Sequence, residues 1–434
     1  MEHEKIIVGL DIGTTKVCVL VGRLDQDNGL SILGVGQAPA EGIMSCKITN
    51  LDKATHAITR AIQQAEGTSG IDIRIANVGI AERHVKSTIH RGSITREATD
   101  EEITVADVRK LTHDMYRTVV PPGHEIIHVI PQSYCVDYEP GIRDPVGMTG
   151  VKLEADFHII TAQTRTINHI YKCVRRAGLE VDHLILEPLA ASLSILSEEE
   201  KEVGVCLVDI GSGSVNVGIF HDALLCHTAI LPIAGDSITS DIKAGCQVMN
   251  YQAALLKDKF GKAIVEQAHP HEVVTIPTLR NRPPKEIGIA NLARIIEARM
   301  AEIIELIHTE IILSGFQDKL AAGVVITGGG AKLHHIKQLF EYVTGLDTRV
   351  GCPSEYPTPS AVDDLQDPSY ATLTGLMLAG LPPTPEQVAH QHVVTAMDAA
   401  TLAKRDSKAA KKGGQFLKKI LDKTKGLLID DYEV

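Results

Sequence analysis

The sequence predicts an α/β fold built from two similar lobes. Residues 8–16 and residues 207–214 repeat one another, because in each an apolar strand leads into Asp-Ile-Gly, small residues and a second apolar run. A third apolar strand, at 322–327, ends in a glycine triplet. Strand-like and helix-like patterns alternate over 434 residues, a length typical of two or more domains. We therefore expect a duplicated fold that holds a ligand between its halves.

Each repeat is typical of a β-hairpin with a glycine-lined turn. Glycine allows backbone N–H groups to approach an anion closely, and Ser and Thr hydroxyls add donors. Asp11 and Asp209 stand near the ends of the two leading strands, where a carboxylate can hold a hydrated Mg²⁺. Together the two hairpins predict that the phosphates of a nucleotide lie between the lobes.

The third loop contains the glycine triplet and is followed by a predicted helix at 332–343. A strand, a glycine turn and a helix N-terminus form a platform on which a nucleoside can lie. None of the three loops has the G-x-x-x-x-G-K-[ST] spacing of a P-loop or the G-x-G-x-x-G spacing of a Rossmann fold, so both of those folds are disfavoured.

Two segments of small residues, at 185–191 and 370–376, complete the pattern. In this order, the five elements resemble the actin, Hsp70 and sugar-kinase superfamily. The resemblance implies a two-lobed actin-like fold, which is a duplicated ribonuclease-H-like fold. It also implies that the two segments are helices that cross at the base of the cleft, where small residues allow close approach.

Composition excludes several classes of protein. The formal net charge of −12 argues against general nucleic-acid binding. Eight cysteines without C-x-x-C spacing favour reduced thiols in a cytoplasm over disulfides or a zinc site. Histidine pairs such as His124/His128 are interpreted as surface or loop residues rather than metal ligands. We expect no signal sequence and no membrane span, because no apolar run approaches ~20 residues.

The character of the chain changes after Gly380. A polar linker is expected at 381–414, followed by an amphipathic helix at 415–429. Between residues 404 and 425, nine Lys or Arg stand against two Asp. A basic amphipathic helix on a tether is typical of a membrane-surface anchor, in which each Lys near anionic lipid contributes ~1 kcal/mol. The predicted membrane-facing residues are Phe416, Leu417, Lys418, Lys419, Ile420, Leu421, Lys423, Leu427 and Leu428. The alternative is a terminal helix that docks on the protein's own core or on a partner.

Residues 83–161 contain the runs Arg-Gly-Ser-Ile-Thr-Arg (91–96) and Asp-Pro-Val-Gly-Met-Thr-Gly (144–150). These runs resemble subdomain 1C of the FtsA family of bacterial cell-division proteins, which is inserted in place of subdomain 1B of actin. The resemblance to this family extends from the first strand to the tail. It implies subdomain 1A at 1–83, 162–195 and 361–380, 1C at 84–161, 2A at 196–235 and 309–360, and 2B at 236–308.

The resemblance further implies a cleft that binds ATP with Mg²⁺. Transferred residue by residue, the nucleotide site comprises Asp11, Gly13, Thr14, Thr15 and Lys16 in the first phosphate loop, Asp209, Gly211, Ser212, Gly213 and Ser214 in the second, and Gly328, Gly329 and Gly330 under the nucleoside. Lys257 resembles a helix residue that reaches the ribose, but Ala254 stands where the family usually has Glu. Glu187 is the candidate to position an attacking water, or alternatively to hydrogen-bond the base of the cleft.

By the same resemblance the protein is an adaptor rather than an enzyme, and any ATP turnover is slow or regulatory. It is expected to polymerise head to tail at the division site, on the cytoplasmic face of the bacterial inner membrane. There it would tether filaments of FtsZ, whose C-terminal peptide docks on subdomain 2B, with Arg294 and Arg299 as candidate contacts. Other division proteins are further implied partners.

Three other classes of protein are alternatives to the adaptor. A kinase or phosphatase of the same superfamily predicts a polar substrate pocket and gives no reason for a basic tail. The related type IV pilus assembly protein is disfavoured by the 1C-like runs and the terminal helix. A chaperone ATPase would need an appended substrate-binding domain, which a polar linker and one helix cannot supply.

Overall fold

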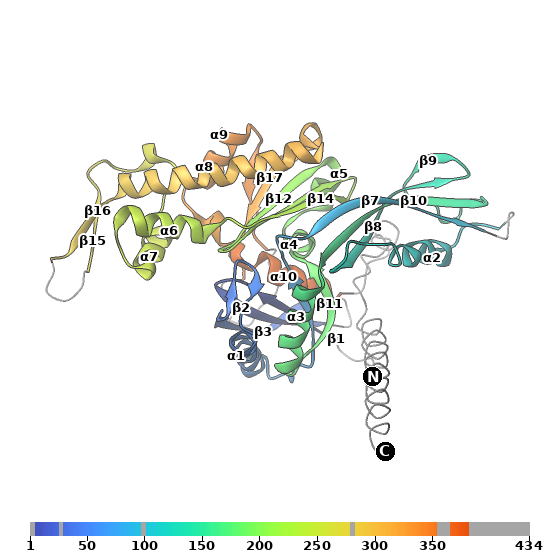
Figure 1. Ribbon diagram of the computed structural model, residues 1–434, viewed down its shortest axis with the longest axis horizontal. Helices are drawn as coiled ribbons and strands as arrows, with labels where there is room; N and C mark the ends of the chain where they lie inside the picture. Colours follow the sequence, from blue (N-terminus) through green and yellow to red (C-terminus); the bar gives the residue numbers. More distant parts are fainter. Residues whose placement is uncertain (1–4, 26–28, 97–100, 278–282, 354–364, 382–434) are drawn as a thin grey trace, which may run out of the picture.

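The computed structural model describes residues 5–25, 29–96, 101–277, 283–353 and 365–381. Two five-stranded sheets form the centres of two lobes, which lie one above the other in Figure 1. The first sheet contains β11 (Glu180–Leu186), β6 (Ile75–Ile80), β1 (Lys5–Ile12), β2 (Lys16–Leu24) and β3 (Leu30–Pro39), in that spatial order. The second contains β14 (Leu224–Leu231), β13 (Val215–His221), β12 (Val205–Ile210), β17 (Val324–Thr327) and β18 (Thr348–Val350).

The two sheets have the same topology. In each, three sequential strands pair antiparallel, and the first of them then pairs parallel with a later strand, which pairs parallel with a fifth. The central strands are runs of Val, Ile and Leu, and every residue of β12 is buried, as expected for strands covered on both faces. The predicted duplication is confirmed.

Helices cover the first sheet, which lies in the lower lobe in Figure 1. The helix α1 (Leu51–Ser69) is capped by the Asn50 side chain, ends at the left-handed Gly70, and buries a face made of Ala and Ile. It packs beside α3 (Thr164–Arg176). A two-residue turn, Ser45–Cys46, joins the short strands β4 (Ile43–Met44) and β5 (Lys47–Ile48).

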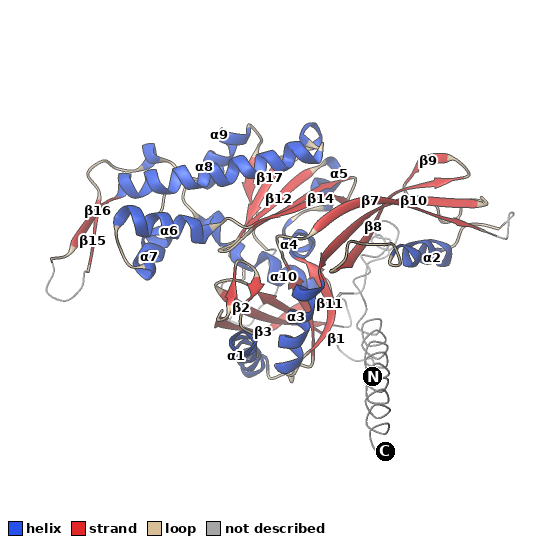
Figure 2. Cartoon of the chain, viewed as in Figure 1, coloured by secondary structure: helices blue, strands red, loops and turns tan. Residues whose placement is uncertain are grey.

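Between β6 and β11 the chain forms an inserted layer with its own core. Its sheet has the order β7 (Lys86–Thr95), β10 (Lys152–Gln163), β8 (His124–Val136) and β9 (Glu139–Ile142), and α2 (Val105–Met115) covers one face. The core of the insert includes Phe157 and Leu111. In Figure 2 the insert extends to one side of the two lobes.

The insert is attached to both lobes. His158 Nδ1 lies 2.9 Å from the carbonyl oxygen of Leu225 in β14, and the backbone N–H of Leu186 donates to His128 Nε2 at 3.0 Å. His128 is fully buried, so its assignment to the surface or to a loop is wrong. Burial, followed by the charges of His158 and His183, lowers the pKa of His128 to about 3. A neutral imidazole there can accept the hydrogen bond from the backbone N–H of Leu186 in β11, an edge strand of its sheet.

The upper lobe carries an extension between β14 and β17. It consists of α6 (Gly235–Cys246), α7 (Asn250–Phe260), the two-stranded sheet β15 (Val273–Ile276) and β16 (Lys285–Gly288), and the long α8 (Ile289–Ser314), which lie opposite the insert in Figure 1. The short helices α5 (Glu198–Val203) and α9 (Ile336–Thr344) complete the lobe. Short 3-10 helices occur at η1 (Val265–Gln267), η2 (Gln317–Lys319), η3 (Gly329–Lys332) and η4 (Pro368–Tyr370).

Two helices cross where the lobes join. They are α4 (Glu187–Ile195) and α10 (Ala371–Leu378), the two segments expected to do so. A Cβ built on Gly375 would lie 1.7 Å from the carbonyl oxygen of Ala190, so the two backbones are in direct contact. The Ser194 hydroxyl donates to the carbonyl oxygen of Ala371 at 2.7 Å. The small residues therefore allow the close approach that the sequence predicted.

Candidate functional site

The two Asp-Ile-Gly hairpins lie at equivalent positions in the two sheets. Asp11 pairs with Cys18 across β1 and β2, and Asp209 pairs with Asn216 across β12 and β13, each one residue before the strand ends. Internal symmetry of the fold thus presents two similar loops from the two lobes.

The loops touch one another. A Cβ built on Gly213 would lie 2.5 Å from Thr14 Oγ1 and 2.9 Å from Ser45 Cα, so only glycine fits between the first loop and the β4–β5 turn. Cys46 joins both loops: its N–H donates to Thr14 Oγ1 at 3.2 Å, and its Sγ lies 2.9 Å from Ser214 Oγ. Hydroxyls from both lobes therefore meet at one place.

Three carboxylates gather behind the loops. Burial, then the charge of Asp209, raises the pKa of Asp11 to about 6. Burial also raises the pKa of Asp209, and burial followed by the charges of Asp11 and Asp209 raises the pKa of Glu187 well above 4.5. Their mutual repulsion, which the positive charge of Lys16 only partly offsets at Asp11, means that this cluster favours a cation or protons.

Two residues outside the predicted set hold this cluster. Asn216 Nδ2 donates to Glu187 Oε2 at 2.7 Å, and the Thr372 hydroxyl donates to Asp209 Oδ2 at 2.8 Å. Asn216 was not predicted from the sequence, although only Val215 separates it from Gly-Ser-Gly-Ser. Asn216 lies opposite Asp209 in the pairing of β13 with β12. Thr372 lies in the predicted crossing segment, but nothing in the sequence pairs it with a loop 163 residues away.

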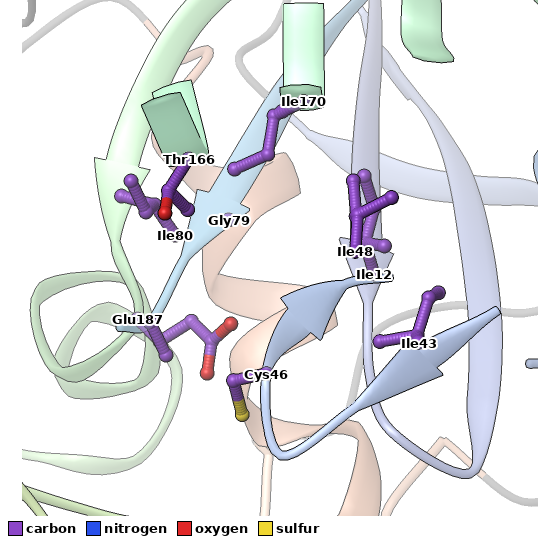
Figure 3. Close-up of a pocket in the computed structure, with 10 residues that line it drawn as sticks. Ile12, Ile43, Cys46, Ile48, Gly79, Ile80, Thr166, Ile170 and Glu187 are labelled. Atoms are coloured by element: carbon purple, nitrogen blue, oxygen red, sulfur yellow. The ribbon is translucent and has the colours of Figure 1, made fainter. Parts of the chain in front are cut away.

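A narrow pocket opens beside Glu187. Its water-accessible volume is about 20 Å³, which is enough for about one water molecule. Figure 3 shows the Glu187 carboxylate and the Cys46 thiol close together, with the side chains of Ile170 and Ile48 farther around the pocket. A carboxylate in such a narrow pocket, whose other lining residues are mostly apolar, can orient a single water.

The third loop reaches the same cluster. A Cβ on Gly328 would lie 2.2 Å from Asp209 Oδ1, so the glycine backbone packs directly on that carboxylate. Gly329 is exposed and Gly330 packs on Ile210. The predicted helix at 332–343 is wrong at its start: the triplet enters η3, and α9 begins only at Ile336, after the left-handed His335.

Lys257 lies near the second loop. Its ammonium donates to the carbonyl oxygen of Gly235 at 3.3 Å and to Thr239 Oγ1 at 3.0 Å, and the Gly235 N–H donates to the carbonyl oxygen of Gly211 at 3.2 Å. Ala254 lies one helical turn before Lys257 on α7 and is partly exposed. The Ser212 hydroxyl donates to Asp236 Oδ1 at 2.5 Å, which ties the loop to α6.

In the first loop, Thr15 is exposed and Gly13 lies where a Cβ would meet the carbonyl oxygen of Lys16 at 2.8 Å. The Lys16 ammonium lies 3.7 Å from the centre of the Tyr370 ring and donates to Ser369 Oγ at 3.2 Å. Because Thr14 meets Gly213 and Gly328 packs on Asp209, the structure brings the three predicted loops together.

The two arginines of α8 differ. Arg299 forms a bidentate pair with Asp241, at 2.5 and 3.2 Å, and a second ion pair with Glu302. Arg294 is exposed and forms no ion pair within the described part of the chain. Of the two, only Arg294 presents a charge without a carboxylate partner among these residues.

Three of the expectations can be compared only with the residues that the structure describes. Among the described residues, no helix has the length and apolar character needed to span a membrane. The same residues hold no group of three or more His, Cys, Asp or Glu side chains arranged to bind a metal directly. The linker and the predicted membrane helix at 415–429 lie outside them.

Comparison of the sequence with known proteins indicates one family. The family described as "Cell division protein FtsA" matches residues 206–375, and "SHS2 domain inserted in FTSA" matches residues 83–161. The cell division protein FtsA of Pseudomonas aeruginosa is 38% identical over 88% of this chain and 90% of its own length. Those of Escherichia coli K12 and Bacillus subtilis are 35% and 33% identical, over 87% of this chain in each case and over 90% and 84% of their own lengths.

Solved structures agree on the fold. The PilM-PilN type IV pilus biogenesis complex has a TM-score of 0.64 at 15% identity, covering 87% of this chain and 99% of that chain. MreB5 of Spiroplasma citri bound to ADP has a TM-score of 0.52 at 14% identity, covering 87% and 96%. These likenesses confirm the actin-like fold, whereas the pilus complex lacks the sequence identity of the cell division proteins. The chain belongs to the FtsA family of cell division proteins.

Proposed function

We propose that this protein binds ATP with Mg²⁺ between its lobes, polymerises, and tethers FtsZ filaments to the cytoplasmic face of the bacterial inner membrane during septum assembly. The observation that carries the nucleotide site is the meeting of two equivalent hydroxyl- and glycine-lined loops at Thr14 and Gly213, with a carboxylate behind each. Family membership and the solved ADP complex of MreB5, a protein of the same fold, support it.

The loops would contact phosphates through backbone N–H groups and through the hydroxyls of Thr14, Thr15, Ser212 and Ser214, with Lys16 adding a positive charge. Gly328–Gly330 would lie under the nucleoside. Lys257, 3.3 Å from the carbonyl oxygen of Gly235, would reach the ribose from the side of the second loop. With Ala254 in the preceding turn, the ribose hydroxyls lose one acceptor.

The carboxylates fit a hydrated divalent cation. Asp11 and Asp209 are hard oxygen donors with raised pKa values, so a positive charge between them would relieve their repulsion. Two carboxylates rather than three suit Mg²⁺, which keeps several waters and binds substrate phosphates. When bound, the ion would neutralise phosphate charge. Glu187, beside the one-water pocket, would orient a water for slow hydrolysis of ATP.

The adaptor role rests on family membership and on the tail. Residues 415–429 would bind anionic lipid as a basic amphipathic helix, and polymerisation would give several such helices avidity. The FtsZ peptide would dock on subdomain 2B, at 236–308. There Arg294 is the better candidate contact, because Arg299 is occupied by Asp241 and Glu302.

The first test is flotation with anionic liposomes, with and without Mg-ATP. The full chain should float and a chain ending at Lys412 should not, and Mg-ATP should increase flotation through polymers. Phe416→Glu should abolish flotation, whereas Gln415→Glu, which adds the same charge outside the apolar set, should not. Equal behaviour of all variants would refute the membrane tether.

The second test addresses the cleft. Gly213→Ala places a methyl group 2.5 Å from Thr14 Oγ1, so the loops must separate, and Mg-ATP should bind at least about ten-fold more weakly. Gly288→Ala is the control, because a Cβ there meets nothing within 4 Å. Isothermal calorimetry measures both. Unchanged affinity in Gly213→Ala would contradict a phosphate site between these loops.

A further inference from the structure

The 3-10 turn η4 (Pro368–Tyr370) crosses from the third loop to the first. On the side of the third loop, the carbonyl oxygen of Pro368 accepts from the Gly328 N–H at 3.2 Å and from Thr327 Oγ1 at 3.1 Å. Asp367, which caps the turn by accepting from the Ser369 N–H at 2.9 Å, also pairs with Lys332 of η3. The turn is therefore anchored to the glycine triplet by main-chain and side-chain contacts.

On the side of the first loop, the same turn holds one side chain. The Lys16 ammonium stands 3.7 Å from the centre of the Tyr370 ring and donates to Ser369 Oγ at 3.2 Å. The ring itself is oriented from β3, because the Tyr370 hydroxyl donates to Gln37 Oε1 at 2.9 Å. A cation over an aromatic face at this distance is attracted to it by the ring quadrupole.

The Lys16 ammonium lies where the first loop meets η4. It belongs to the first residue of β2 and contacts η4, which is hydrogen-bonded to Gly328, and a Cβ on Gly328 would lie 2.2 Å from Asp209 Oδ1. A free lysine side chain has high rotamer entropy, which must be lost when its ammonium is fixed on an anion. A turn that already fixes the ammonium there removes part of this cost.

We propose that Tyr370 and Ser369 are positioning residues for Lys16: the aromatic ring and the hydroxyl hold the ammonium ready for the phosphates of a nucleotide. This inference rests on the proposed nucleotide site and adds to it. In this proposal η4 links the third loop, which would lie under the nucleoside, to Lys16 of the first phosphate loop. Tyr370 and Ser369 act through Lys16 and need not contact the nucleotide themselves.

The test uses the full chain in two measurements. In the first, without nucleotide, an amine-acetylating reagent labels lysines and peptide mass spectrometry follows Lys16. Tyr370→Leu should increase the labelling rate of Lys16 about five-fold or more, Ser369→Ala should increase it less, and Tyr370→Phe, which keeps the ring, should not. Labelling of Lys259, an exposed lysine of α7, is the internal reference.

In the second measurement, calorimetry with Mg-ATP should show affinity reduced about five- to thirty-fold in Tyr370→Leu and within about two-fold of wild type in Tyr370→Phe. In a Lys16→Met background, adding Tyr370→Leu should reduce the affinity for Mg-ATP little further. Thermal unfolding checks that each variant is folded, and Ser369→Ala replaces Tyr370→Leu if the latter is not.

The outcomes separate the two ideas. Equal labelling of Lys16 in wild type and in the folded Tyr370→Leu and Ser369→Ala variants would overturn the positioning role, whatever happens to nucleotide. Tighter ATP binding by Tyr370→Leu would also overturn it, because the turn would then sequester Lys16. So would a loss of ATP affinity from Tyr370→Leu that is as large in the Lys16→Met background as in wild type. Ring-dependent labelling in a protein that binds no ATP would instead support the positioning of Lys16 and refute the proposed nucleotide site.

Discussion

Replacing Gly375 by Ala tests how the two lobes are joined. The added methyl group would lie 1.7 Å from the carbonyl oxygen of Ala190 and 2.3 Å from its carbonyl carbon. Both are backbone atoms, so no side-chain rotation relieves the overlap. To bring the shorter distance to 3.0 Å, α4 and α10 must move apart by more than ~1 Å.

The expected loss of stability follows from two opposing effects. Overpacking of this kind costs up to ~3 kcal/mol or more when only backbone can move. Alanine in a helix regains up to ~1 kcal/mol over glycine. The net expectation is a decrease of ~2 kcal/mol in the free energy of unfolding. Because α4 starts at Glu187 and α10 contains Thr372, the separation should also disturb the carboxylate cluster and weaken Mg-ATP binding.

Urea unfolding measures the change. The matched control is Gly67→Ala in α1, where a Cβ would meet nothing within 4 Å, so this variant should gain ~0.5–1 kcal/mol. If Gly375→Ala proved as stable as wild type while Gly67→Ala behaved as expected, the direct contact between the two backbones would be wrong.

Two further predictions concern pH. Burial raises the pKa of Glu187 well above 4.5, so ionisation of this group favours the unfolded state at any pH above 4.5. Glu187→Gln should therefore stabilise the nucleotide-free protein at pH 7. The gain in stability should shrink as the pH falls toward 4.5. A pH-independent difference in urea midpoints would contradict this. Burial lowers the pKa of His128 from 6.5 to about 3, so protonation of this group favours unfolding increasingly below pH 6.5. His128→Leu should lower the free energy of unfolding by ~1–3 kcal/mol at pH 7, because it leaves the Leu186 N–H unpaired. On acidification, however, this variant should lose less stability than wild type. Parallel stability curves for His128→Leu and wild type would refute the second argument.

Local pattern was sufficient to predict the loops and the crossing helices. Asp11 and Asp209 were found because each lies in a short, repeated run whose chemistry is contiguous in sequence. Gly375 was expected in a close helix contact because small residues have few other reasons to cluster in an apolar helix. The duplicated sheet was expected from the repeat itself, because two similar runs in the two halves of one chain indicate a duplicated fold.

What the sequence did not reveal depends on distant pairing. Cys46 joins Thr14 to Ser214, which lies 168 residues after Cys46 in the chain, through a turn whose sequence, Met-Ser-Cys-Lys, carries no ligand motif. The late start of α9 depends on the left-handed His335, a conformation that is uncommon for any residue other than glycine. The burial of His128 depends on the insert packing against β11, which is a tertiary contact.

The contact of Gly213 with Thr14 also limits how the lobes can move. Gly213 meets the Thr14 side chain and the backbone of the β4–β5 turn, and Gly375 of α10 meets the backbone of α4, so the two lobes are already in contact at both places. Such a joint has a hard stop in one direction and freedom only in the other. A ligand between the loops can therefore only set how far this protein opens, and each bound state would be a defined degree of opening measured from one fixed end point.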